Sequence, residues 1–280
     1  MHEIIAVVFD FDDTLAPDTT SGFLAKHGID TQDFWQNKVN PLYADDWDPV
    51  PAYLHKMIQC GNEGSLPLTQ SELEIWGKEA PLHEGTESIF SRLRAAVEDA
   101  NPKATLEFYV ISSGIGDVLR STRIAHEFKD IWASELYYGE DGRAAFPRKI
   151  ISFTDKTRYL FHIQKGLIGK SSRGKPLEVN EKFSYEALRI PFSNMIFVGD
   201  GLTDVPCFSL LTKENGMAIG VYEKQHATKW PRAYEFIAQK RVSTLCSANY
   251  LEGSDLSNFL TMAVRNLAGR IAVSKAAFRG

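Results

Sequence analysis

The stretch from Ile4 to Leu15 constrains the fold of this chain more than any other. An apolar, β-branched run leads directly into Asp10-Phe11-Asp12-Asp13-Thr14. A continuous apolar run is typical of a strand that is buried on both faces, as in a parallel sheet. Ligands of open α/β sheets bind at the carboxyl ends of the strands, which is where these carboxylates fall.

Asp10 and Asp12 are two residues apart, so in extended geometry they point the same way. Carboxylates held side by side repel each other, and a hard divalent cation relieves that repulsion. The competing interpretation is a strand that runs into an acidic, solvated turn, because short motifs also occur by chance. In either case Asp13 is interpreted as a turn-forming residue.

Composition limits the classes of protein that remain. A chain of 280 residues suits one large domain, or a core domain with a sizeable insert. The net charge of −5 gives no reason to expect nucleic acid or an anionic membrane as partner. The first apolar run is too short for a signal peptide, and no segment approaches transmembrane length. Three cysteines without metal-ligand spacing, which cannot all pair, indicate buried thiols in a reducing cytoplasm: Cys60, Cys207 and Cys246.

Residues 17–82 predict a small helical insert after the first strand. Helical pieces alternate there with Gly, Pro, Asn and Asp, and no alternating strand pattern is present. The expected helices cover Thr19–His27, Thr31–Asn37, Val50–Cys60 and Thr69–Ala80.

The remainder of the chain predicts strands and helices in broad alternation. Further strands are expected at 106–111, 131–138, 195–198 and 217–222, and a hairpin turn at 140–143 returns the chain through 144–153. Helices are expected over 89–97, 117–125, from 154, 181–188, up to 211 and 255–278. This order predicts an α/β fold, with a parallel sheet and helices on both of its faces.

Three predicted strand ends carry polar groups that suit phosphoryl transfer. The acidic segment follows the first strand, Ser112-Ser113-Gly114 follows the second, and Gly199-Asp200-Gly201-Leu202-Thr203-Asp204 follows another. In a parallel sheet these ends share one edge, so carboxylates, hydroxyls and amides meet there. An aspartate can attack phosphorus while donors hold the phosphoryl oxygens, and a second aspartate can transfer the proton.

With these motifs the chain resembles the haloacid dehalogenase (HAD) superfamily of aspartate-nucleophile phosphatases, over Glu3 to Tyr222. The resemblance implies a Rossmann-like core, residues 1–16 and 83–280, and a helical cap domain, residues 17–82, as in the phosphoserine phosphatase-like branch. It implies Mg²⁺-dependent hydrolysis of a small phosphorylated metabolite through an aspartyl-phosphate.

Roles carried over from the resemblance fall on named positions. Asp10 would be the nucleophile and a metal ligand, and Asp12 the general acid and base, with its main-chain carbonyl on Mg²⁺. Asp200 would bind the metal and Asp204 would support it. The phosphoryl group would be bound by Thr14, Ser112, Ser113 and Gly114.

The lysine that the superfamily places beside its nucleophile has two candidates here. Lys156 follows the strand-like segment 150–153 and opens a helix, so its ammonium and the helix N-terminus would both face the anion. Lys182 is nearer in sequence to the metal motif, but no strand precedes it. The context favours Lys156.

Several alternatives stay open. The same intermediate would serve a phosphotransferase or mutase, and an inactive binding protein could share the fold. Ala16 to Thr20 stands where phosphoserine phosphatases carry a substrate-reading glutamate, so phosphoserine is not assigned. Asp18 could read a substrate amine, although a solvated loop acid is the ordinary interpretation. Residues 143–175 hold nine Lys and Arg against one acid; they could extend an anion site, and a solvated loop is the default. The oligomeric state is not predicted.

Overall fold

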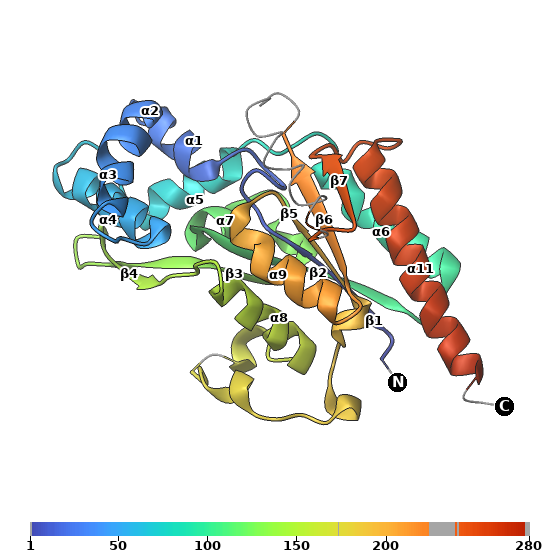
Figure 1. Cartoon of the computed structure of the whole chain (residues 1–280). Helices are drawn as coiled ribbons and strands as arrows, with labels where there is room; N and C mark the ends of the chain where they lie inside the picture. The colour runs from blue at the N-terminus through green and yellow to red at the C-terminus, as the bar shows by residue number, and fades with distance from the viewer. Residues whose placement is uncertain (1, 173, 224–238, 240, 278–280) are drawn as a thin grey trace.

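The computed structural model of the chain describes residues 2–172, 174–223, 239 and 241–277. In this part of the chain, seven strands form one sheet in the order β4-β3-β2-β1-β5-β6-β7 (Figure 1). Neighbouring strands run parallel, except that β3 and β4 form an antiparallel hairpin. The strands are β1 (Ile4–Phe9), β2 (Thr105–Ile115), β3 (Phe128–Tyr138), β4 (Ala144–Lys149), β5 (Met195–Gly199), β6 (Met217–Tyr222) and β7 (Thr244–Ser247).

The apolar run of β1 occupies the centre of the sheet because both of its faces are buried. Alternate side chains enter two separate cores, Val7 in the larger and Val8 in the smaller. The larger core contains the apolar stripes of α6 (Thr86–Ala100) and α11 (Asp255–Ala277). The smaller contains those of α8 (Asp155–Lys165) and α9 (Val205–Lys213). The predicted α/β sheet with helices on both faces is confirmed.

The segment between β1 and α6 is helical, as predicted. It contains α1 (Thr19–Lys26), α2 (Thr31–Asp33), the π-helical turn η1 (Phe34–Val39), α3 (Asn40–Tyr43), α4 (Pro49–Asn62) and α5 (Gln70–Glu79). Figure 1 shows these helices gathered at one side of the molecule, next to β4 and α7 (Gly116–Ser121). The hairpin joins them, because the Ala144 amide donates to the Leu68 carbonyl at 2.9 Å.

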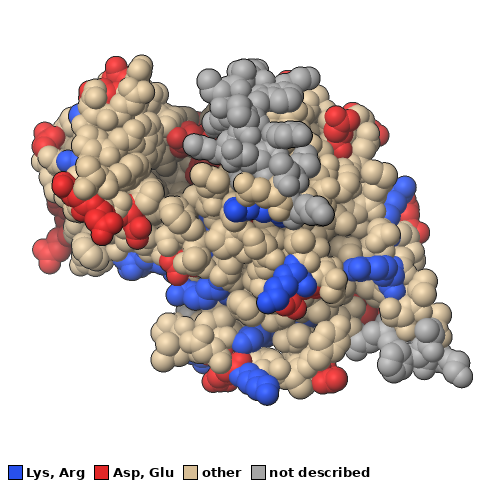
Figure 2. Space-filling view, viewed as in Figure 1, with Lys and Arg blue, Asp and Glu red and all other residues tan. Residues whose placement is uncertain are grey.

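Charge is distributed unevenly over these two parts. Residues 17–82 contain ten acidic and four basic side chains. On the face shown in Figure 2, acidic atoms prevail over the helical segment, and Lys and Arg atoms lie over the elements below it.

Some predicted helix and strand boundaries were wrong. The errors fall on short segments, which either bury no apolar face or end before the predicted residue. Residues 181–188 form only the 3₁₀ turn η5 (Tyr185–Ala187), because they are mostly exposed and an isolated short helix is unstable. Residues 150–153 are not a strand, since Ile151 donates its amide to the Ser134 hydroxyl at 3.1 Å instead. The predicted helix 117–125 ends at Ser121, and β7 was not predicted.

Two compositional expectations concern cysteines and membranes. All three cysteines are buried and free, as predicted. Within the described ranges, every helix falls short of the length and apolar character that a membrane span requires.

Candidate functional site

The candidate site begins at Asp10, where β1 ends between its neighbours β2 and β5. The Asp10 amide donates to the Val198 carbonyl on β5 at 2.9 Å, which fixes the backbone at the sheet edge. Its Oδ1 accepts from the Phe11 amide at 2.7 Å, and the side chain is buried. The chain then turns rather than remaining extended, since the amides of three residues point back to the Phe11 carbonyl: Thr14, Leu15 and Ala16.

Asp12 lies in this turn and is held by the first helix of the helical segment. Its Oδ1 accepts from the Thr19 amide at 2.8 Å and from the Thr19 hydroxyl at 2.6 Å. Burial, assisted by the charge of Asp18, raises the pKa of Asp12 to about 8, and the bonds from Thr19 act in the opposite direction. A carboxyl with such a pKa is protonated in most of the molecules near neutral pH, so it can deliver a proton.

Ser112 and Ser113 bring hydroxyls to the same edge from the end of β2. The Gly114 amide, predicted to bind a phosphoryl group, donates to Ser112 Oγ at 3.0 Å. Among the described residues, Ser113 Oγ and Thr14 Oγ1 are buried without a hydrogen-bond partner. Because buried hydroxyls nearly always have partners, each of these two can still make a further hydrogen bond.

Gly114 allows Asp12 and the Ser112 loop to approach each other. A Cβ at this position would lie 2.5 Å from Asp12 Oδ2 and 3.3 Å from Ser112 Oγ. Any larger residue would therefore displace one of the two predicted site residues.

Lys156 lies in the first turn of α8 and reaches across to β1. Its Nζ is 2.6 Å from Asp10 Oδ2 and 2.7 Å from Asp204 Oδ1, and it is fully buried. Burial by itself lowers the pKa of this lysine, but the two carboxylates outweigh it and hold the pKa above its ordinary value. The rival candidate, Lys182, is exposed, and the contacts to Asp10 and Asp204 are made by Lys156.

Three aspartates form an acidic cluster beside this lysine. Carboxylate oxygens of Asp10, Asp200 and Asp204 all lie within 4.8 Å of one another. Burial raises the pKa of Asp200 well above its ordinary value, and the charges of Asp204 and Asp10 raise it further. Burial also raises the pKa of Asp204, to about 6, against the opposing effect of Lys156.

The chemistry of this cluster fits a hard divalent cation. Its donors are carboxylate oxygens, and among the described residues their crowded negative charge exceeds that of the Lys156 ammonium. Asp204 already uses Oδ1 for Lys156 and Oδ2 for the Gly201 amide, which suits a supporting role. A carboxylate oxygen of Asp200 belongs to the same cluster, which suits the predicted role of metal ligand.

The helical segment contributes contacts that the sequence did not indicate. The Tyr53 hydroxyl, on α4, donates to the Ser113 carbonyl at 2.7 Å. In the sequence, the apolar stripe of α4 could have indicated that Tyr53 points inward. Nothing in the sequence indicated that it would contact Ser113. Asp18 does not face outward as a free acid: it caps α1 and accepts from the Thr20 and Ser21 amides at 2.9 and 3.1 Å.

Comparison with known proteins supports the fold. No family model matches the chain. An uncharacterized protein of Borreliella burgdorferi is 27% identical over 287 residues, covering 92% of this chain and 96% of that protein.

Solved structures that share the architecture are more distant in sequence. A phosphoserine phosphatase with a phospho-aspartyl intermediate analogue has a TM-score of 0.55 at 17% identity, over 93% of this chain and 99% of that one. A substrate-bound phosphoserine phosphatase has a TM-score of 0.55 at 16% identity, over 94% and 99%. A HAD family hydrolase of Salmonella enterica serovar Typhi has a TM-score of 0.60 at 11% identity, over 94% and 71%. The chain therefore has the fold of the HAD family hydrolases and phosphoserine phosphatases.

Proposed function

We propose that this protein hydrolyses a small phosphomonoester through a phosphorylated Asp10. The observation that carries the proposal is the contact between Lys156 Nζ and Asp10 Oδ2 at 2.6 Å, at the edge where Asp12 and Ser112 also lie. The ammonium fixes the carboxylate and balances charge beside it, which is what a nucleophile that attacks an anion requires.

In the first step, the Asp10 carboxylate attacks phosphorus and the bond from phosphorus to the leaving oxygen breaks. Asp12 gives its proton to that oxygen, so the product leaves as an alcohol. Thr14 Oγ1 and Ser113 Oγ donate to the phosphoryl oxygens. These roles agree with the unpartnered hydroxyls and with the raised pKa of Asp12.

In the second step, water attacks the phosphorus of phosphorylated Asp10. Asp12, now a carboxylate, takes the proton from this water, and phosphate is released as the Asp10 carboxylate re-forms. Positioned proton transfer of this kind contributes about 10²–10⁴-fold to the rate. The Lys156 ammonium stays beside Asp10 through both steps.

Mg²⁺ would be held by Asp10, the Asp12 main-chain carbonyl and Asp200, with Asp204 in support. When bound, the metal neutralises negative charge between the carboxylates and the phosphoryl group. These few protein ligands suit Mg²⁺, which keeps several of its waters.

The helical segment, residues 17–82, would act as a cap domain over the core of residues 1–16 and 83–280. Its contacts to the site support this division, since Thr19 holds Asp12 and Tyr53 reaches Ser113. A cap of this kind excludes water and selects substrate. The three free thiols support a cytoplasmic location, where small phosphorylated metabolites are available.

Phosphate release from a panel of phosphorylated metabolites tests the proposal. We expect Mg²⁺-dependent hydrolysis of at least one of them, and a loss of at least about 10³-fold in Asp10→Asn, because an amide cannot attack phosphorus. The exposed Asp99 provides a matched control, Asp99→Asn. If Asp10→Asn, shown to be folded by circular dichroism, hydrolysed its substrate normally, the mechanism would be wrong. Transfer of phosphate to an added alcohol or sugar would identify a phosphotransferase instead.

A further inference from the structure

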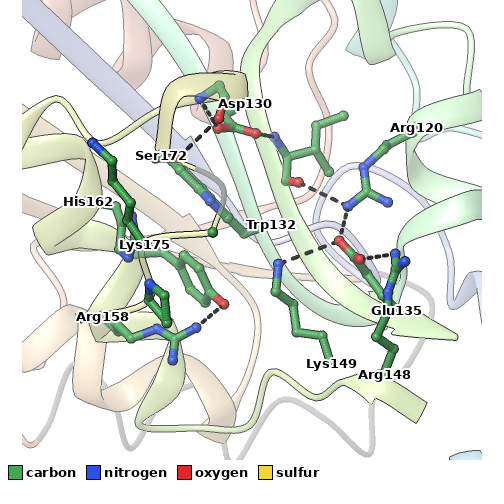
Figure 3. Close-up of a pocket in the computed structure, with 15 residues that line it drawn as sticks. Arg120, Asp130, Trp132, Glu135, Arg148, Lys149, Arg158, His162, Ser172 and Lys175 are labelled. Carbon is green, nitrogen blue, oxygen red and sulfur yellow. Dashed lines mark hydrogen bonds and ion pairs between the residues drawn. The ribbon is translucent and has the colours of Figure 1, made fainter. Parts of the chain in front are cut away.

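A cavity lies among β3, β4 and α8, separate from the candidate active site. It has a volume of about 530 Å³, and none of the residues assigned to the active site lines it. Figure 3 shows long cationic side chains that enter it from both sides. Its size falls within the usual range of about 300–1,000 Å³ for small-molecule sites.

One carboxylate in this cavity is contacted by three cations. Glu135 on β3 accepts from Arg120 Nη2 at 2.8 Å and from Arg148, and Lys149 Nζ lies at 3.5 Å (Figure 3). A single carboxylate balances only one of these charges. Burial lowers the pKa of Lys149, and the charges of Arg120 and Arg158 lower it further, whereas Glu135 raises it. Lys149 therefore lies among crowded positive charges.

The opposite wall carries charges of both signs. Arg158, on α8, lies over the Tyr159 ring at 4.7 Å from its centroid. Lys175 is paired with Glu178 at 3.6 Å. Asp130 accepts from the Gly169 amide at 2.7 Å. Leaving Lys175 aside, four cations therefore face the two carboxylates of Glu135 and Asp130, an excess of two positive charges among the described residues.

We propose that this cavity binds a small anion with two adjacent phosphate groups. The excess of two charges matches such an anion, and arginine guanidinium groups bind phosphate through paired hydrogen bonds. Trp132 and Tyr159 line the cavity but are buried, and Arg158 lies over the Tyr159 ring, so the ligand is held by charge rather than by stacking. The helical segment that contacts Asp12 and Ser113 is strongly acidic, which disfavours binding of a polyanion at the active site.

The basic run of residues 143–175 thus has more order than a solvated loop. It supplies Arg148 and Lys149 at the end of β4 and Arg158 on α8, and Arg120 joins them from α7. Arg158 lies two residues after Lys156 on the same helix, which puts the two side chains on different faces of α8.

Calorimetric titration of the full chain with pyrophosphate tests the site. EDTA is present, so that the acidic cluster of the active site carries no metal and repels the anion. We expect one binding site, and about tenfold weaker binding in Arg148→Gln and in Lys149→Gln, since each loses a charge-assisted contact. Glu135→Gln should bind more tightly, because it removes the carboxylate that competes with the ligand. Lys213→Gln, an exposed lysine on α9, is the matched control.

The response of Glu135→Gln separates a binding site from a purely structural ion-pair cluster. Loss of stability without tighter binding would overturn the proposal, as would a wild-type chain that does not bind pyrophosphate. If Arg148→Gln failed to fold, Arg148→Lys, which keeps the charge, takes its place. This variant should fold, and its affinity for pyrophosphate should fall by less than tenfold relative to the wild type. Inorganic phosphate that bound as tightly as pyrophosphate would also contradict the proposal. Tighter binding of ADP than of pyrophosphate would support the site and identify a nucleotide as its ligand.

Discussion

Lys156 offers the sharpest test at the scale of single residues, because Lys182 is a natural control. Lys156→Met removes the cation that pairs with two buried carboxylates, Asp10 and Asp204. We expect kcat to fall by about 10²–10³-fold, as for other groups that stabilise charge in a transition state. We also expect a lower unfolding temperature, because an uncompensated buried charge costs about 3–5 kcal/mol. Lys182→Met, in an exposed position, should change neither quantity.

The metal dependence of the reaction tests the acidic cluster. Activity should disappear in EDTA and return with Mg²⁺, and Ca²⁺ should inhibit because its coordination is less strict. Asp200→Asn should require about tenfold or more Mg²⁺ for half-maximal activity, measured as phosphate release against metal concentration. Full activity in excess chelator would contradict the assignment of this cluster.

Individual site residues were predictable only where a motif fixes their position. Asp10 and Asp200 follow apolar strands, and the sequence is sufficient to bring them to one edge of a parallel sheet. The contact between Lys156 and Asp10 could be predicted only from the neighbouring segments, because no motif links the two residues. They are 146 residues apart, and most of the core is built from the chain between them. Tyr53 left no signal, since its partner is a main-chain carbonyl, and any residue supplies one.

At the scale of elements, β2 can approach the turn after β1 because residue 114 is a glycine and has no side chain. Gly114→Ala would place Cβ 2.5 Å from Asp12 Oδ2, whereas Gly201→Ala would meet nothing closer than 3.6 Å. We expect kcat/KM to fall by about 10²-fold in Gly114→Ala, since a displacement of about 1 Å has that effect. Gly201→Ala should retain most of its activity. Equal losses in both variants would show that clearance at Gly114 is not the cause.

Long apolar strands were predicted well, and short elements poorly, for a physical reason. The strands β1 and β5 are buried on both faces, so their sequences are apolar throughout. The short strand β7 is added at the edge of the sheet by pairing with β6, which its own four residues do not encode. The chain leaves β4 after Lys149, where the Ile151 amide donates to the Ser134 hydroxyl on β3. The residues of β4 alone do not encode this bond.

At the scale of the whole molecule, a partly buried ion pair ties the long connection before β5 to the sheet. Both Nη atoms of Arg189 bind Glu107 on β2 at 2.6 Å, and the Tyr109 hydroxyl donates to the same carboxylate at 2.5 Å. Burial by itself raises the pKa of Glu107, but these bonds outweigh it and hold the pKa below the ordinary value of 4.5.

This ion pair should make stability depend on pH in a defined direction. Because the folded state has the lower pKa, its contribution is complete above the unfolded pKa and is lost as pH falls through the folded pKa. Glu107→Gln should therefore lose about 1–3 kcal/mol of unfolding free energy at pH 7, and much less at pH 3, in urea titrations. Glu98→Gln, an exposed glutamate of α6, is the control. An equal loss at both pH values would exclude ionisation of Glu107 as the cause.

The central position of β1 has a consequence for the synthesis of the chain. One edge of β1 pairs with β2, and the other pairs with β5, where Ala6 lies opposite Met195. The chain from β1 to β5 must therefore be synthesised before the second edge can pair. While the ribosome is still translating the intervening residues, the second edge of this apolar strand has no partner, and such edges recruit other chains. Contacts this distant in sequence also form slowly. This edge of the nascent chain therefore stays unpaired until residues 195–199 have been synthesised.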